Sequence, residues 1–215
     1  MTAHIALLSS LLIAASRAEI IDRIAVTLDN QVITASEITL EIRLTAFLNG
    51  DPLDFSPSAR QKAAGRLIEQ KLIRREIQLG RYPTPPPEEA ERMLKEIQQQ
   101  RFDGAAEYRH ALANYGVSEG DLKAHLLWQL TLLRFIDIRF RPGVEVTDAE
   151  IQSYFDGNQA KLQAQSGTSK RLSLNDLRSQ IRETLTEQGA DKQLDVWLAE
   201  ARKRTRIEFH QEAFQ

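Results

Sequence analysis

The chain has 215 residues, a formal net charge of −2, 42% hydrophobic residues and 27% charged residues. This near-neutral balance argues against a dedicated nucleic-acid-binding protein, which normally carries a surplus of Lys and Arg. The absence of cysteine excludes disulfides, thiolate nucleophiles and cysteine-ligated metals. The length is sufficient for one substantial hydrophobic core or two small ones.

Residues 1–18 have the pattern of a cleaved secretory signal. An apolar run at 5–15 precedes Ser16-Arg17-Ala18, which places small residues at the two positions that a signal peptidase reads. The run is too short to span a bilayer, so we expect no stable membrane insertion. No Lys or Arg precedes the run, and a short membrane anchor or an N-terminal core segment therefore remains an alternative.

Residues 20–34 predict a β-hairpin that leads directly into a helix. Asp29-Asn30 supplies the turn, and Thr34 with Glu37 forms a capping box at the start of a helix that extends to Phe47. The apolar residues that alternate along the first strand are Ile24, Val26 and Leu28.

Apolar spacing predicts three further helices before the middle of the chain. Their residue ranges are 56–79, 88–101 and 105–115. In the first of these helices the charged residues Lys71, Arg74, Arg75 and Glu76 are interpreted as the solvated face. The proline-rich stretch 82–87 predicts a stiff, extended connector to the next helix.

The longest helix signal spans residues 118–140. Ser118 and Asp121 mark its start, and Arg141-Pro142-Gly143 marks its end. Two apolar stripes run along it, one of Leu122, Leu126, Leu130, Leu133 and Phe140, the other of Trp128, Leu132 and Phe135. A helix with two apolar stripes needs contacts on more than one side, so we expect other helices to lie against it, or a binding partner to cover the part of its surface that they leave exposed.

The C-terminal part predicts a short helix, a linker, a long helix and a strand. The short helix follows a capping box at Thr147 and Glu150 and extends to Phe155, and the polar segment 157–171 predicts a linker. The long helix starts at Ser173, and Gly189 separates two offset apolar stripes along it. The helix therefore either kinks there or packs against different neighbours along its length. Residues 206–209 alternate like a strand that could complete the N-terminal hairpin.

The order of these elements resembles the SurA-type periplasmic chaperones, in particular their N-terminal domain family, and the parvulin-associated relatives. The segments that carry the resemblance are 21–38, 102–155 and 174–209. It implies a mainly α chaperone core with a small hairpin (19–156), completed by a C-terminal helix and strand (172–215). Residues 157–171 stand where relatives carry an isomerase domain of about a hundred residues. Fifteen residues cannot hold that domain, so the resemblance implies a non-catalytic protein.

The resemblance implies a periplasmic holdase that works without ATP and without cofactors. Its expected partners are unfolded or nascent outer-membrane proteins, bound through an apolar groove, and a homodimer is possible. The candidate client-binding residues are Tyr108, Tyr115, Trp128 and Phe135. Each of them is also a candidate for the hydrophobic core.

The sequence contains no recognisable catalytic or metal-binding constellation. His110 and His125 lie on different predicted helices, His210 lies in the tail, and none has a histidine or cysteine at metal-ligand spacing. Phosphate loops, nucleophile elbows and zinc-protease motifs are absent. We therefore predict that the chain is not an enzyme. The alternatives are a non-catalytic assembly subunit that forms a strand- or helix-exchanged dimer, and an isomerase with a diverged site, which a proline-limited refolding assay would detect.

Overall fold

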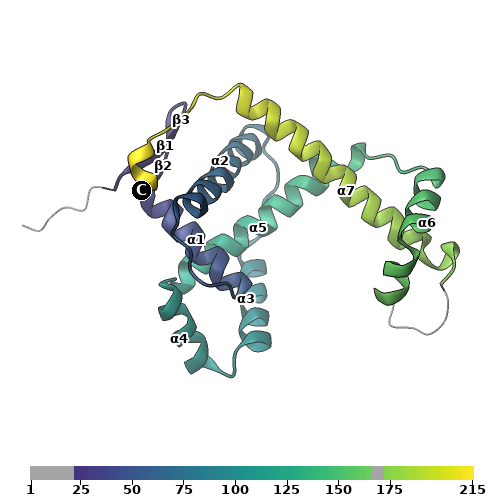
Figure 1. The fold of residues 1–215 in the computed structure, drawn as a ribbon, viewed down its shortest axis with the longest axis horizontal. Helices are drawn as coiled ribbons and strands as arrows, with labels where there is room; N and C mark the ends of the chain where they lie inside the picture. The colour runs from purple at the N-terminus through teal and green to yellow at the C-terminus, as the bar shows by residue number, and fades with distance from the viewer. Residues whose placement is uncertain (1–21, 166–171) are drawn as a thin grey trace, which may run out of the picture.

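The computed structural model describes residues 22–165 and 172–215, and the predicted signal segment lies outside them. The described chain is mainly α-helical with one small antiparallel sheet, as the sequence predicts (Figure 1). The strands are β1 (Ile24–Leu28), β2 (Gln31–Thr34) and β3 (Ile207–Phe209). The helices are α1 (Ala35–Asn49), α2 (Pro57–Gly80), α3 (Pro87–Arg101), α4 (Ala105–Tyr115), α5 (Glu119–Arg139), α6 (Asp148–Gln165) and α7 (Leu174–Lys203). Two short 3-10 turns are η1 (Arg141–Gly143) and η2 (Gln211–Phe214).

The small sheet joins the two ends of the described chain. Its strand order is β2-β1-β3, and Val26 of β1 lies opposite both Ile33 of β2 and Phe209 of β3. The backbone N–H of His210 donates to the carbonyl of Ala25 at 2.9 Å. The prediction that the terminal strand completes the hairpin is confirmed, and the third strand gives the hairpin the support that a lone two-stranded ribbon lacks in water.

The predicted capping boxes at the starts of α1 and α5 are confirmed. The Glu37 N–H donates to the Thr34 hydroxyl at 3.3 Å, and the Thr34 N–H donates to the Glu37 carboxylate at 2.8 Å. Ser118 and Asp121 exchange the equivalent bonds at 3.0 and 3.3 Å. Both helices therefore begin where their own sequence satisfies the free amides of the first turn.

Helix α5 has contacts on more than one side, as the sequence predicts, and its two halves pack into two separate clusters. Leu122 and Leu126 in its first half pack with residues of α1, α3 and α4. Trp128 and Phe135 lie further along and pack with the sheet, α2 and α7. These two clusters make up the body of the protein, and α5 connects them.

Helix α7 is continuous, and Gly189 marks the point where its neighbours change. Leu177 and Ile181 pack against α6, whereas Ala190 and Leu198 belong to the main core. A Cβ atom added at Gly189 would lie 2.5 Å from Cγ1 of Val144. Of the two alternatives for this helix, a kink or packing against different neighbours, the second is confirmed. One continuous helix contributes to two clusters, and the absence of a side chain at Gly189 permits the close approach of Val144.

The prediction of a linker at 157–171 is wrong for residues 157–165, which continue helix α6. Leu162 lies three turns after Ile151, and both side chains are buried against Leu177 and Ile181 of α7. The intervening Gln, Lys and Ala residues are good helix formers, so few apolar contacts suffice to hold the segment. Residues 166–171 of the predicted linker lie outside the described residues.

Helix α6 and residues 174–188 of α7 form an arm that extends away from the body. Figure 1 shows α6 beside the first half of α7, at the opposite side of the molecule from the sheet. Ile151, Leu162, Leu177 and Ile181 give the arm a small core of its own. The second half of α7 then crosses the body and leads to β3.

Replacing Gly189 by valine is expected to lower the free energy of unfolding by about 1–2 kcal/mol, because the new side chain overlaps Val144. Urea unfolding followed by circular dichroism measures this change. The matched control is Gly157→Ala in α6, where an added Cβ meets no atom within 4 Å. That control is expected to stabilise the helix by up to about 1 kcal/mol. Equal stabilities for Gly189→Val and the wild type would contradict the close packing at this point.

Candidate functional site

The four aromatic client-binding candidates lie in two separate parts of the body. Tyr108 is buried beside α3, and the half-buried Tyr115 donates its hydroxyl to the carbonyl of Asp51 at 3.0 Å. Trp128 and Phe135 are 5% and 1% exposed in the other cluster. The four residues therefore do not lie together, since Tyr108 and Tyr115 belong to one cluster and Trp128 and Phe135 to the other. Tyr108 and Trp128 each border surface hollows, and their contact with a client stays a prediction.

Trp128 borders a hollow of about 460 Å³ between α2, α5 and the connector that precedes α3. Apolar side chains form most of its wall, and these are Ile77, Pro85, Pro87, Ala124, Leu127 and Trp128. Its polar lining residues are Arg74, Gln78, Thr84 and Thr131. The proline-rich connector, which the sequence predicts as extended, thus forms one wall of a surface site.

A second hollow, of about 340 Å³, lies between α1, α2 and α5 and shares Arg74, Ala124 and Trp128 with the first. The Arg74 guanidinium lies 4.1 Å from the centroid of the Trp128 ring, a cation–π contact. Burial lowers the pKa of Arg74, although arginine stays protonated at neutral pH. A positive charge therefore stands at the boundary between a largely apolar hollow and a second hollow that also contains the carboxylates of Glu37, Glu41 and Asp121.

A buried carboxylate links three helices beneath the second hollow. Glu41 of α1 is 5% exposed and accepts from Nε of Arg66 at 2.8 Å and from the Gln70 amide at 3.4 Å, both on α2. Nδ1 of His125 on α5 lies 3.8 Å from the Glu41 carboxylate. Because both carboxylate oxygens already have donors, the group joins α1, α2 and α5 and is poorly placed to act as a general base.

His125 is a neutral member of this polar cluster at pH 7. Burial lowers the pKa of the imidazole, and this effect outweighs the nearby Glu41, which raises it; Arg66 lowers it further. Nε2 of His125 lies 3.2 Å from the amide nitrogen of Gln129. Since that amide is a donor, the imidazole proton sits on Nδ1 and faces Glu41.

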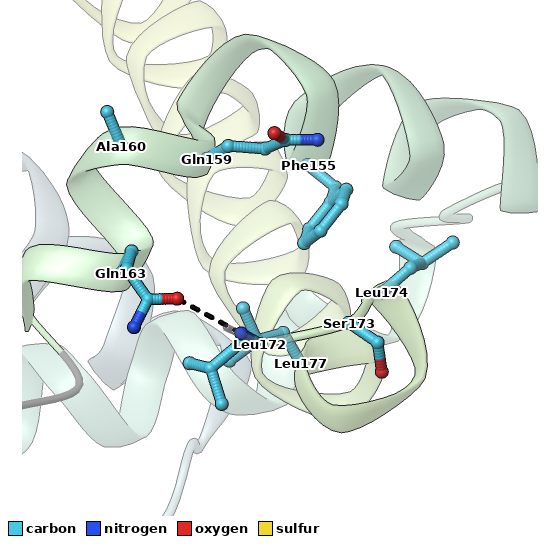
Figure 2. A pocket seen from close by; sticks show the side chains of 8 residues that line it. All are labelled: Phe155, Gln159, Ala160, Gln163, Leu172, Ser173, Leu174 and Leu177. Atoms are coloured by element: carbon cyan, nitrogen blue, oxygen red, sulfur yellow. Dashed lines mark hydrogen bonds between the residues drawn. The ribbon is translucent and has the colours of Figure 1, made fainter. Parts of the chain in front are cut away.

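The arm carries the largest of these hollows, about 630 Å³ between α6 and the start of α7 (Figure 2). Phe155, Leu172 and Leu177 contribute apolar surface, and Gln159 and Gln163 contribute amides. The backbone N–H of Leu172 donates to Oε1 of Gln163 at 3.0 Å, which joins the two walls. The arm therefore presents an open, mainly apolar surface away from the body.

A further hollow, of about 360 Å³, lies where α3 turns into α4. Phe102 and Tyr108 form its aromatic wall, and Gln98 and Gln99 lie beside them. Burial raises the pKa of the Tyr108 phenol, so the hydroxyl stays protonated at neutral pH. This hollow offers the same combination of apolar surface and neutral amides as the arm.

Neither comparison with known proteins nor the arrangement of the described residues assigns a chemical activity to the chain. No protein-family model matches the chain, and no curated protein matches it in sequence. Within 22–165 and 172–215, no group of three or more His, Cys, Asp or Glu side chains is arranged to hold a metal ion. In the same part of the chain, no helix is both long enough and apolar enough to cross a membrane.

Sequence patterns miss two residues that line the hollows beside Trp128, namely Glu41 and Arg74. Glu41 lies three residues after Ile38 on the buried face of α1, and an acidic residue on an apolar stripe is a detectable signal. Arg74 is interpreted from sequence as part of a solvated face, but its guanidinium packs on Trp128. No local pattern could reveal a contact between residues that are 54 positions apart in the chain.

Proposed function

We propose that this chain is an ATP-independent holdase that binds unfolded polypeptides through several shallow sites. One observation carries the proposal: three of the hollows described above combine apolar walls with glutamine amides. These glutamines are Gln159 on the arm, Gln78 beside Trp128, and Gln98 and Gln99 beside Tyr108.

This combination suits an unfolded chain of variable sequence. A glutamine amide has both donor and acceptor groups, so it can pair with the N–H or the carbonyl of any peptide unit. The apolar walls shield exposed side chains at about 25 cal/mol per Å² removed from water, less the entropy of ordering the client. Contacts at the arm and at both sides of the body are individually weak but act together on one long client.

The resemblance to the SurA-type chaperones supplies the client class and the compartment. We extend the proposal on that basis to unfolded outer-membrane proteins in the periplasm. The predicted signal segment at residues 1–18 supports the same location. Neither the client class nor the compartment follows from the hollows themselves, since apolar and amide groups would serve any unfolded polypeptide.

Fluorescence anisotropy of a labelled, urea-denatured outer-membrane β-barrel protein tests the binding directly. We expect the anisotropy to rise on addition of the purified chain without nucleotide. The same barrel protein, folded in detergent, is the control and should leave the anisotropy unchanged. Equal binding of the folded and denatured forms would contradict a holdase for unfolded clients.

The exchanged-dimer alternative would use the same strand pairing. Strand β3 pairs with β1 of its own chain, and an exchanged dimer would form this pairing between two chains. An assembly subunit of this kind stays a prediction, and sedimentation across a range of concentrations would test it.

A further inference from the structure

Arg74 differs from the neighbouring cations on α2, because those cations bind carboxylates. The pairs are Arg66 with Glu41 at 2.8 Å, Lys71 with Glu37 at 3.2 Å, and Arg75 with Asp29 at 3.0 Å. Within the described residues, Arg74 has no such ion pair, and its recorded partner is the face of the Trp128 ring. Arg74 therefore retains the capacity to form charge-assisted hydrogen bonds with an anionic ligand.

The contact with Trp128 leaves the guanidinium with donors for such a ligand. The central carbon of the Arg74 guanidinium lies 4.1 Å from the centroid of the Trp128 ring, and the N–H groups of an arginine form a planar fork that matches a carboxylate. The side chain contacts the Trp128 ring and remains accessible to solvent. Burial also lowers the pKa of Arg74, which indicates that water solvates the charge incompletely. A carboxylate could therefore accept two hydrogen bonds from a donor that is already positioned.

The hollow beside Arg74 defines the rest of the ligand. Arg74 is the only charged residue among those that line it, and the main walls are Ile77, Leu127 and the prolines of the connector. Its volume of about 460 Å³ is within the range of pockets for small ligands. The matching ligand has one anionic group joined to an apolar body.

We propose that Arg74 binds the C-terminal carboxylate of a polypeptide whose last side chain is apolar and enters the hollow against Ile77 and Leu127. The proposal rests on the proposed function, since it names one end of the client chain as a preferred contact. An internal Asp or Glu fits less well, because it would bring a peptide backbone on both sides into a hollow with few polar partners. A chain end brings its charge and its apolar side chain together.

The test compares two fluorescein-labelled hexapeptides of identical sequence ending in phenylalanine, one a free acid and one a C-terminal amide. Anisotropy titrations of the full chain should show about tenfold tighter binding of the free acid, typical of a charge-assisted contact. Arg74→Gln should abolish the difference between the two peptides. Arg75→Gln is the matched control, because Arg75 pairs with Asp29 away from the hollow, and it should preserve the difference. Circular dichroism checks that both variants fold.

Several results would overturn the inference. Equal binding of acid and amide by the wild type would do so, but binding of both peptides would leave the holdase proposal standing. An amidated peptide with an internal Asp that binds as tightly as the free acid would exclude a chain-end site. Complete displacement of the free acid by decanoate at equal concentration would indicate a fatty-acid site. Absence of denatured-client binding by the wild type would instead refute the proposed function itself.

Discussion

Replacing Phe135 by alanine is expected to lower the free energy of unfolding by about 3–5 kcal/mol, the range for removing a large buried aromatic ring. The Phe135 ring is 1% exposed and makes edge contacts with Tyr82, Phe140 and Trp197 at centroid distances of 5.0, 5.5 and 6.1 Å. Its loss would leave a cavity where α5, α7 and the connector meet. Urea unfolding followed by circular dichroism measures the change.

The matched control for Phe135 is Leu133→Ala on the same helix. Leu133 is 59% exposed although its spacing places it on an apolar stripe, so its truncation should change stability by less than about 0.5 kcal/mol. A Phe135→Ala variant with wild-type stability but impaired client binding would contradict the core assignment. It would restore Phe135 as a binding residue.

Replacing Glu41 by alanine is expected to lower the free energy of unfolding by about 2–3 kcal/mol. The variant removes a buried acceptor and leaves Arg66 and Gln70 without their partner on α1. The expected loss of stability is smaller than the largest losses for a broken buried ion pair, because the Arg66 side chain is 42% exposed and can be solvated again. Glu41→Gln keeps an acceptor oxygen for Arg66, so it should lose less stability than Glu41→Ala in the same urea assay.

The pKa of His125 gives a second test of the contacts around Glu41. Its folded-state pKa lies below the ordinary 6.5, so the unfolded chain takes up the proton first as the pH falls through about 6.5. His125 therefore lowers the free energy of unfolding as the pH becomes acidic. Glu41→Gln removes the one nearby charge that raises the His125 pKa, and an NMR titration should find that pKa lower still. A rise in the pKa would contradict the assigned contact.

Local signals explain why much of the fold is predictable from sequence. Thr34 with Glu37 and Ser118 with Asp121 satisfy helix starts within four residues of chain, so the starts of α1 and α5 follow directly. The two offset stripes on α7 likewise indicate two packing environments. In each case the residues that decide the structure are close together in the sequence.

The remaining features depend on contacts between distant residues. The second half of α6 is held by Leu162 against α7, a single apolar side chain within a polar segment that resembles a linker. The stacking of Arg74 on Trp128 joins two helices, and the connector completes the hollow beside them only after folding. Periodicity identifies Trp128 as apolar but cannot show that this residue borders a surface hollow.

The holdase proposal is tested most directly by light scattering of a urea-denatured outer-membrane β-barrel protein diluted into buffer without nucleotide. The chain from Glu19 onward is added at a stoichiometric ratio, and a folded helical protein of similar size serves as the control. The proposal predicts that the chain suppresses the scattering and the control does not. Unchanged scattering in the presence of a chain that circular dichroism shows to be folded and helical would contradict it.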